Sequence, residues 1–208
     1  AKGKAKRGDF ATYATRFLRS GDAIFAKALD DRMGCATLIE LLKHVPPQIE
    51  FLAAFSVQEE IGLRGARVAA YDFQPDLAIA IDSTPAVDMP RPDGRENTQY
   101  NCKLGAGPAI YLADAGTLSD PRLVNFLTRV AEENHLNFQY RQPGGGGTDA
   151  GALHLTGKGF PVVSVSIPGR YAHTAVMMAS LRDWQNTLQL LQFALQNMTS
   201  KLFALDRP

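Results

Sequence analysis

The chain has 208 residues, 45% of them hydrophobic and 21% charged, a composition that is typical of a folded globular protein and excludes a largely disordered one. Its 22 basic and 21 acidic side chains leave a formal net charge of +1, so we expect neither nucleic acid nor a membrane surface as a partner. No apolar run approaches the roughly 18 residues that span a bilayer, and Cys35 and Cys102 form no CxxC or Cys/His cluster, so we expect a cytoplasmic protein with free thiols.

The amino-terminal part of the chain predicts a strand and then alternating helices and strands. Residues 9–17 (DFATYATRF) alternate weakly between apolar and polar side chains and indicate an isolated strand. From Ala23 onward the pattern is αβ, with a helix predicted over residues 34–45 (GCATLIELLKHV). Residues 49–57 (IEFLAAFSV) are a nearly continuous apolar run, which predicts a strand buried on both faces of a sheet.

The remainder of the chain continues this alternation. We expect helices over residues 63–71, 119–135 and 148–155, strands over 76–82, 108–113 and 162–167, and a loop over 85–107. Ser119 is a suitable N-cap, and Ser180 with Asp183 resembles a capping box that opens a last helix reaching about Phe203. The order of elements predicts an α/β fold, with a mostly parallel sheet flanked by helices on both faces.

Acidic side chains gather where the expected strands end. Five carboxylates and one histidine follow a strand or precede the first helix: Asp30, Asp31, Glu59, Glu60, Asp82 and His173. Ligands in an open parallel sheet bind beyond the carboxyl ends of its strands, so we expect these side chains at one edge of the sheet.

So many anions repel one another unless a cation lies among them. Carboxylates together with an imidazole suit zinc, cobalt or manganese. A carboxylate shared by two ions would create a two-metal hydrolytic site that activates a water. Consecutive residues leave a strand in different directions, so one of Glu59 and Glu60 can bind metal while the other accepts the proton of that water.

Each signal also has an ordinary structural interpretation. Asp30 and Asp31 suit the N-terminus of a helix, the Glu59–Glu60 pair suits a solvated helix start, and His173 suits a loop. The glycine run at 144–147 suits a flexible turn, or an anion cradle at a helix N-terminus. Three further histidines fall in helical patterns and are interpreted as structural, with His154 as the first exception to consider: His44, His135 and His154. The joint placement of the acids at strand ends favours a site.

Five segments occur together and in order: AKALDDRMGC (26–35), FSVQEEIGLRGA (55–66), DLAIAIDSTPA (76–86), GGGGTDAGALH (144–154) and PGRYAHTAVMM (168–178). They resemble the signature blocks of the tetrahedral, or deblocking/glutamyl, aminopeptidases, some of which are labelled endoglucanases. The resemblance covers about residues 9–208. It implies a zinc-peptidase-like fold, two divalent ions (zinc or cobalt, with manganese possible as well), peptide substrates, and a homo-oligomer, which is a hollow dodecamer in the family.

The resemblance also implies roles for the matching residues. It assigns four metal ligands: Asp30, Glu60, Asp82 and His173. Asp30 would bridge both ions, and Asp31 would be the catalytic-site neighbour joined to it by a cis peptide bond. Glu59 would be the general base. The loop that lines the substrate cleft would supply Gly147, Thr148 and Asp149.

Members of this family are longer at the amino end, where they supply a further histidine ligand and most of a small β-barrel domain. No histidine precedes Asp30 in this chain. We therefore expect residues 1–22 to be a remnant of that β-barrel insertion domain, and residues 23–208 to be a metallopeptidase catalytic domain that is incomplete at its amino end. Exposed sheet edges would then favour association.

Three functions follow as hypotheses. The first is a metal-dependent aminopeptidase. The second keeps the metal site but acts as an amide deacylase or a glycosidase, although a glycosidase needs two carboxylates flanking a sugar and these acids cluster as ligands. The third is a non-catalytic or partially metallated fragment or assembly subunit, which the lack of a histidine before Asp30 favours and the complete set of blocks opposes.

Overall fold

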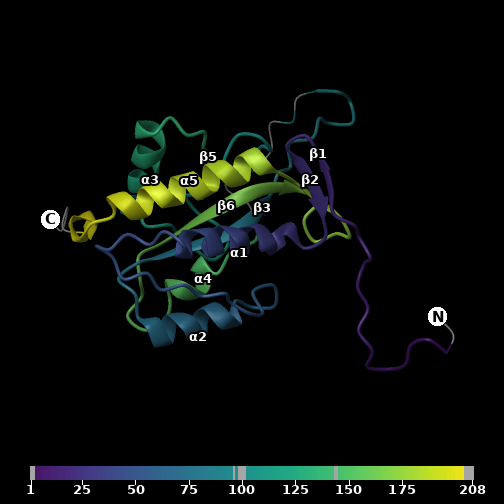
Figure 1. Ribbon diagram of the computed structural model, residues 1–208, viewed down its shortest axis with the longest axis horizontal. Helices are drawn as coiled ribbons and strands as arrows, with labels where there is room; N and C mark the ends of the chain where they lie inside the picture. Colours follow the sequence, from purple (N-terminus) through teal and green to yellow (C-terminus); the bar gives the residue numbers. More distant parts are fainter. Residues whose placement is uncertain (1–2, 96, 98–101, 143–144, 204–208) are drawn as a thin grey trace.

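A computed structural model describes residues 3–95, 97, 102–142 and 145–203 of the chain. In this part of the chain, one sheet of seven strands lies between two layers of helices (Figure 1). The strands are β1 (Leu18–Ser20), β2 (Ala23–Ala26), β3 (Ala78–Pro85), β4 (Ala109–Tyr111), β5 (Gln139–Arg141), β6 (Val162–Arg170) and β7 (Met177–Ser180). Their order is β1-β2-β7-β6-β4-β5, and β3 pairs with β6.

The sheet is mixed. β3 runs parallel to β6 and β4 runs parallel to β5, whereas the other four pairs are antiparallel. Short connections join β1 to β2 and β6 to β7, and tight connections of this kind join antiparallel neighbours only. The α/β class with helices on both faces is therefore confirmed, while the expectation of a mostly parallel sheet is wrong.

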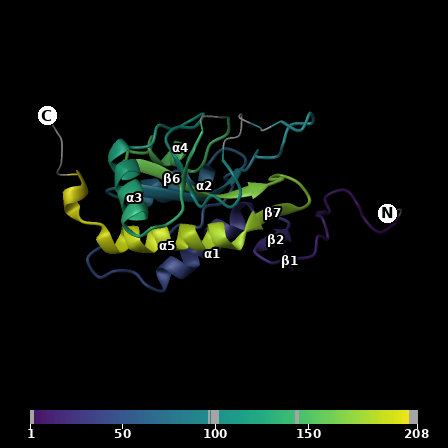
Figure 2. The same ribbon diagram turned by 90° about the horizontal axis from the view of Figure 1, so that it is seen from above.

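Three helices cover the apolar face of the sheet: α1 (Leu29–Leu42), α3 (Pro121–Glu133) and α5 (Leu181–Asn197). Figure 2 shows α1, α3 and α5 gathered along one side of the sheet. Leu127 of α3, Leu190 of α5 and Val165 of β6 are fully buried in this core. Burial of one such side chain contributes on the order of 1.5–3 kcal/mol, so this layer fixes the position of the sheet.

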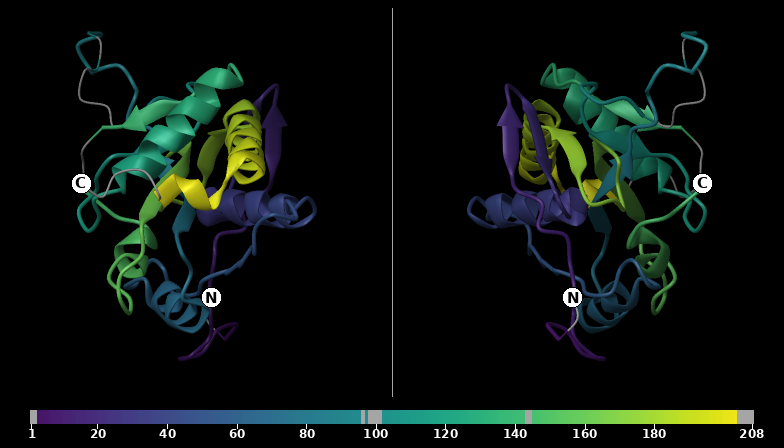
Figure 3. Two further views of the ribbon diagram at one scale, coloured as in Figure 1. Left: turned by 90° about the vertical axis from the view of Figure 1, so that its left-hand side faces the viewer. Right: turned by 90° about the vertical axis from the view of Figure 1, so that its right-hand side faces the viewer.

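Two short helices, α2 (Arg64–Phe73) and α4 (Ala150–Leu153), lie on the opposite face (Figure 3). Ala150 packs there against Ala80 and Val162 in a small cluster. The remaining side chains that β3 and β6 present on this face are polar, Asp82, Thr84 and Ser164 among them. The candidate site is built at the end of this polar face.

Residues 49–57 form no strand, contrary to the sequence-based expectation. The segment has no ladder partner among the described residues, and Leu52, Phe55 and Val57 are 41%, 49% and 66% exposed. An apolar run predicts burial, but a strand also needs a hydrogen-bonded neighbour on at least one edge, and local sequence does not encode that neighbour. The end of the segment is still fixed, because the Gly65 N–H donates to the Val57 carbonyl at 2.9 Å.

Residues 9–17 also form no strand. The first strand is β1, which pairs with β2, and β2 joins the main sheet through β7. The preceding segment is exposed, and Thr15 fastens it by donating from its hydroxyl to the Ala175 carbonyl at 2.6 Å. Weak alternation in this segment is not accompanied by a partner among the described residues.

The helix boundaries differ from expectation at several positions. α1 begins at Leu29 rather than at residue 34, although Asp30 and Asp31 keep non-helical dihedral angles. Asp120, and not Ser119, caps α3 by accepting from the Arg122 N–H at 2.9 Å. α5 ends at Asn197, and a separate 3₁₀ turn (η1, Ser200–Phe203) follows.

Ser180 caps α5 as expected, since its hydroxyl oxygen accepts from the Asp183 N–H at 3.3 Å. The Asp183 carboxylate does not complete the capping box. It is fully buried and accepts from the Gly105 and Gly107 N–H groups at 2.7 and 2.8 Å. This acid therefore anchors the end of the loop predicted over residues 85–107, of which residues 96 and 98–101 lie outside the described residues.

Candidate metal centre

The start of α1 places two adjacent carboxylates at the edge of the sheet. The Asp30–Asp31 peptide bond is cis, as the resemblance implies. Ala28 before it has a φ of 52°, and two residues across the site, Tyr171 and His173, have φ of 64° and 59°. Such left-handed conformations cost on the order of 1–3 kcal/mol each for residues other than glycine and gather at functional sites.

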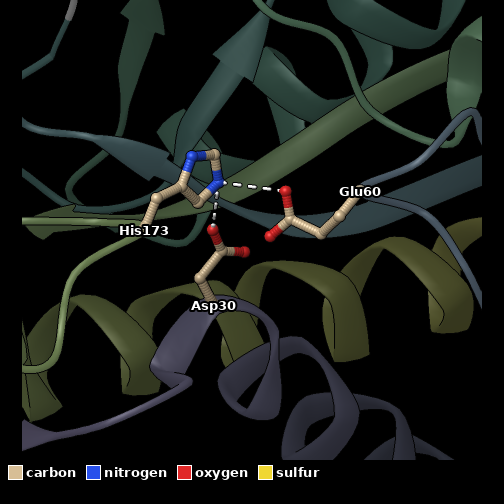
Figure 4. Close-up of side chains that lie close together, drawn as sticks. All are labelled: Asp30, Glu60 and His173. Atoms are coloured by element: carbon tan, nitrogen blue, oxygen red, sulfur yellow. Dashed lines mark ion pairs between the residues drawn. The ribbon is translucent and has the colours of Figure 1, made fainter. Parts of the chain in front are cut away.

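Three side chains from distant parts of the chain meet at this edge. The Nε2 atom of His173 lies 3.2 Å from an oxygen of Asp30 and 3.2 Å from an oxygen of Glu60 (Figure 4). Asp30 comes from the start of α1, Glu60 from the turn before α2, and His173 from the connection between β6 and β7. All three were sequence candidates, and the fold brings them together.

These spacings fit a divalent ion. Two ligand atoms on a tetrahedral ion with bonds of about 2.0–2.1 Å lie about 3.3 Å apart, close to both observed separations. The three ligand atoms lie within 4.8 Å of one another. Two carboxylates and one imidazole are also a donor set that zinc, cobalt and manganese accept.

A second acidic group shares Asp30 with the first. One oxygen from each of Asp30, Asp31 and Asp82 lies within 4.8 Å of the others. Burial raises the pKa of Asp31 to about 8, with a further increase from the Asp30 charge. Burial raises the pKa of Asp82 to about 9, with further increases from Asp31 and Asp30. Without a cation, these carboxyls therefore hold protons at neutral pH, so the group fits a positive ion.

Glu59 lies next to both groups. Burial raises its pKa to about 7, and the charges of Asp149, Glu60 and Asp30 raise it further. A carboxyl whose pKa lies near neutrality can accept a proton and release it again.

The glycine-rich turn supplies the remaining sequence candidates, apart from Gly144, which lies outside the described residues. Gly147 is exposed. Thr148 is fully buried, and its hydroxyl lies 2.6 Å from the Ser164 hydroxyl. Asp149 accepts a short hydrogen bond from the Ser56 hydroxyl. Thr148 therefore ties the turn to β6, while Asp149 faces the segment that leads to Glu59.

A pocket of about 240 Å³ opens beside the first group. Asp30, Glu60 and His173 form part of its wall, and Lys27 and Tyr13 complete it with other residues. Sequence reasoning missed Lys27, Tyr13 and Ser56. No motif pointed to Tyr13 or Ser56, whereas Lys27 lies inside the first signature block.

The histidines interpreted as structural stay outside the site. Neither of the two metal-type groups found among the described residues contains His44, His135 or His154. The Nδ1 atom of His154 lies 2.9 Å from the Ala150 carbonyl, one helical turn earlier. Both cysteines are free thiols.

Comparison with known proteins supplies an independent view. Residues 3–190 match the family model described as M42 glutamyl aminopeptidase. A lysyl aminopeptidase of Pyrococcus furiosus is 34% identical over 194 residues, which are 92% of this chain and 54% of that protein. The chain thus spans about half the length of the curated relatives it matches.

Solved structures agree with the sequence match. An aminopeptidase from the archaeon Desulfurococcus kamchatkensis superposes with a TM-score of 0.84 at 34% identity, covering 91% of this chain and 53% of that one. The TET1 peptidase of Pyrococcus horikoshii, whose title states that it can assemble into a tetrahedron or a large octahedral shell, superposes with a TM-score of 0.74 at 30% identity, covering 89% and 54%. Among the described residues, no helix combines the length and apolar character needed to cross a membrane.

Proposed function

We propose that this chain, which belongs to the M42 glutamyl aminopeptidase family, carries the catalytic site of a metal-dependent aminopeptidase acting on peptides. The observation that carries the proposal is the convergence of Asp30, Glu60 and His173 at ligand-like spacing from three separate segments. Membership of the family supports hydrolysis at a peptide's amino end as the reaction.

Each candidate residue has a place in this function. Asp30, Glu60 and His173 would hold one divalent ion, while Asp30 with Asp82 would hold a second, which makes Asp30 the bridging carboxylate. Bound ions of this kind polarise the scissile carbonyl and lower the pKa of a water molecule. Zinc or cobalt are the ions we favour, because each accepts carboxylate and imidazole ligands.

Glu59 performs the proton transfers. Its carboxylate takes a proton from the attacking water and delivers it to the leaving amine, which a group with a pKa near 7 does in both directions. Asp31 lies beside the shared carboxylate and orients the start of α1, since its oxygen accepts from the Gly34 N–H at 2.9 Å. The exposed Gly147 backbone and the Asp149 carboxylate border the side from which a peptide end enters.

A pocket of about 240 Å³ beside the ligands suits the end of a peptide rather than a folded protein. The family description names glutamyl substrates, and the Pyrococcus furiosus relative is named for lysyl ones. Names alone therefore do not transfer a residue preference to this chain.

The decisive test combines metal content with turnover. We expect the dialysed chain to take up zinc or cobalt, measured by elemental analysis, and to hydrolyse leucyl-p-nitroanilide when the metal is supplied. Bound metal with no turnover, on any of a panel of aminoacyl-nitroanilides, acylated amino acids and cellulose derivatives, would contradict the proposed activity. It would favour the non-catalytic alternative instead.

We also propose that the chain associates with copies of itself. The described surface carries exposed apolar side chains on and before β1, including Phe17 and Leu18, each 63% exposed. An unpartnered edge strand with such side chains favours association. Light scattering after size-exclusion chromatography should give a mass above that of one chain, and a strictly monomeric mass would contradict this.

A further inference from the structure

The face of the sheet opposite the main core carries a buried polar surface that the proposed metal ligands do not use. Side chains two residues apart on a strand share a face, so Asp82 and Thr84 of β3 point the same way, as do Ser164 and Ser166 of β6. Asp82 is paired in register with Ser166. Thr84, Ser164 and Ser166 are each at most 1% exposed. The metal-type group at Asp82 therefore borders this polar surface directly.

Arg141, the last residue of β5, lies on this surface and is only 3% exposed. Its Nε donates to the Thr84 hydroxyl at 3.3 Å and one Nη donates to the Gly145 carbonyl at 2.7 Å. The guanidinium lies over the ring of Tyr111, with its carbon 4.6 Å from the ring centre. The geometry thus aims the charged end of Arg141 from β5 toward the end of β3, where Asp82 lies.

The charge of Arg141 is not balanced by a neighbour. Its second Nη is buried and has no hydrogen-bond partner. No carboxylate oxygen of a described residue lies within 4.0 Å of the guanidinium. A buried cation without a counter-charge is costly, and buried charges are normally paired. The observation therefore points to an anion that belongs beside Arg141.

Other unpaired atoms surround the same region. Five buried side-chain atoms lack a hydrogen-bond partner among the described residues, and they belong to Asp114, Thr117, Arg141, Asp149 and Ser166. The glycine-rich turn connects them, because the Ala115 N–H donates to the Gly146 carbonyl at 3.0 Å and Asp149 ends the turn. Unsatisfied buried groups are rare in folded proteins, so their concentration on one side of the metal-type groups indicates a binding site.

We infer that Arg141 recognises a carboxylate on the side chain of the peptide's amino-terminal residue. This inference rests on the proposed function and gives it a substrate class: peptides that begin with an acidic residue. Arg141 offers a planar, permanently charged donor that matches a carboxylate, a few residues from the ligands that would face the scissile bond. On the side of the turn, the guanidinium is covered by the Gly145 carbonyl, and Gly145 to Gly147 have no side chains to obstruct an approaching carboxylate.

The test compares two substrates that differ only in charge, glutamyl- and glutaminyl-p-nitroanilide. We expect the full chain, supplied with zinc or cobalt, to give a kcat/KM at least about 10-fold higher for the glutamyl compound. Arg141→Met should remove that preference by lowering the glutamyl value about 10- to 100-fold, as expected for a lost charge-assisted hydrogen bond, while the glutaminyl value changes little. Arg129→Met, which removes an exposed arginine of α3, is the matched control and should leave both values unchanged.

Equal turnover of the two substrates by the wild-type chain, or an equal loss of both in Arg141→Met, would overturn the inference and leave Arg141 as a structural cation. Arg141→Lys keeps the charge and should retain part of the preference, so a general folding defect is recognisable by thermal melting of all variants.

A binding measurement separates this inference from the proposed function. If neither nitroanilide is hydrolysed, calorimetry with free glutamate and glutamine still tests the residue. Glutamate binding at least about 10-fold tighter than glutamine binding, with the difference lost in Arg141→Met, supports an anion site in a chain that lacks the proposed activity. Equal affinities would refute the site itself.

Discussion

At the scale of single residues, the site is governed by carboxyl groups crowded together at low solvent exposure. The pKa values of Asp31, Glu59 and Asp82 are all raised, in each case first by burial and then by neighbouring negative charge. The sequence identified all three residues, because each directly follows or precedes an apolar element. It could not show that Asp31 shares a ligand group with Asp30 and Asp82, since that contact depends on the non-helical start of α1.

Glu59→Gln tests the proton transfer. We expect kcat for leucyl-p-nitroanilide to fall at least about 10³-fold, because the amide can neither take the water's proton nor return it to the amine. Metal content should stay unchanged. The exposed Glu132→Gln on α3 serves as a control and should retain full activity. Turnover within a few-fold of wild type in Glu59→Gln would remove this residue as the base.

Asp31 gives the metal-free chain a characteristic pH dependence. Its pKa is about 8 in the folded chain against roughly 3.9 in an unfolded one, so the folded state binds the extra proton between these values. The free energy of unfolding should therefore decrease as pH rises from about 4 to about 8. Urea unfolding in the presence of a chelator, at pH 5 and pH 8, measures this decrease. Asp31→Asn should make the decrease smaller, and an unaltered slope would contradict the assignment.

At the scale of elements, short strands and unpaired segments account for most differences between prediction and structure. β2, β5 and β7 have three or four residues each, too few for a period-of-two pattern to stand out. Residues 49–57 have the opposite character, a strong apolar run that forms no ladder among the described residues. α3 and α5 were predicted well because their apolar faces repeat over several turns, and only their ends moved.

The first turns of α1 contain a glycine that the element requires. A Cβ atom on Gly34 would lie 2.1 Å from an oxygen of Asp31. Glycine to alanine in a helix normally stabilises by roughly 0.5–1 kcal/mol, but here the added methyl displaces the Asp31 carboxylate. We expect Gly34→Ala to destabilise the chain by about 1–3 kcal/mol in urea unfolding and to weaken metal binding. Gly116→Ala, whose Cβ would meet no atom closer than 3.9 Å, should be tolerated; equal effects of the two would argue against this account.

At the scale of the whole molecule, the helices α1, α3 and α5 hold one face of the sheet in a core, and the site sits at the end of the polar face. The three ligands of the first group come from positions 30, 60 and 173, so the folded chain as a whole forms the group. An ion bound there links the start of α1 to the β6–β7 connection. Metal binding should therefore stabilise the entire fold rather than one loop.

A divalent ion at about 100 times its dissociation constant adds about 2.7 kcal/mol to the free energy of unfolding. For a chain of this size, that corresponds to a rise in melting temperature of several degrees. We expect zinc or cobalt to raise the melting temperature and a chelator to reverse the rise. Asp30→Asn should abolish it, because Asp30 belongs to both ligand groups, while the exposed Asp76→Asn should not. An equal response in both variants would contradict the placement of the ion.

The sequence by itself determined the α/β class, the family resemblance, and the acidic residues and histidine of the candidate site, because each depends on local periodicity or on residues adjacent in the chain. Tertiary structure alone decided the mixed strand directions, the sharing of Asp30 between two groups, and the burial of Arg141 without a counter-charge. These properties depend on which segments become neighbours. Pairing energy comes from partners tens of residues apart, and no short stretch of sequence records that choice.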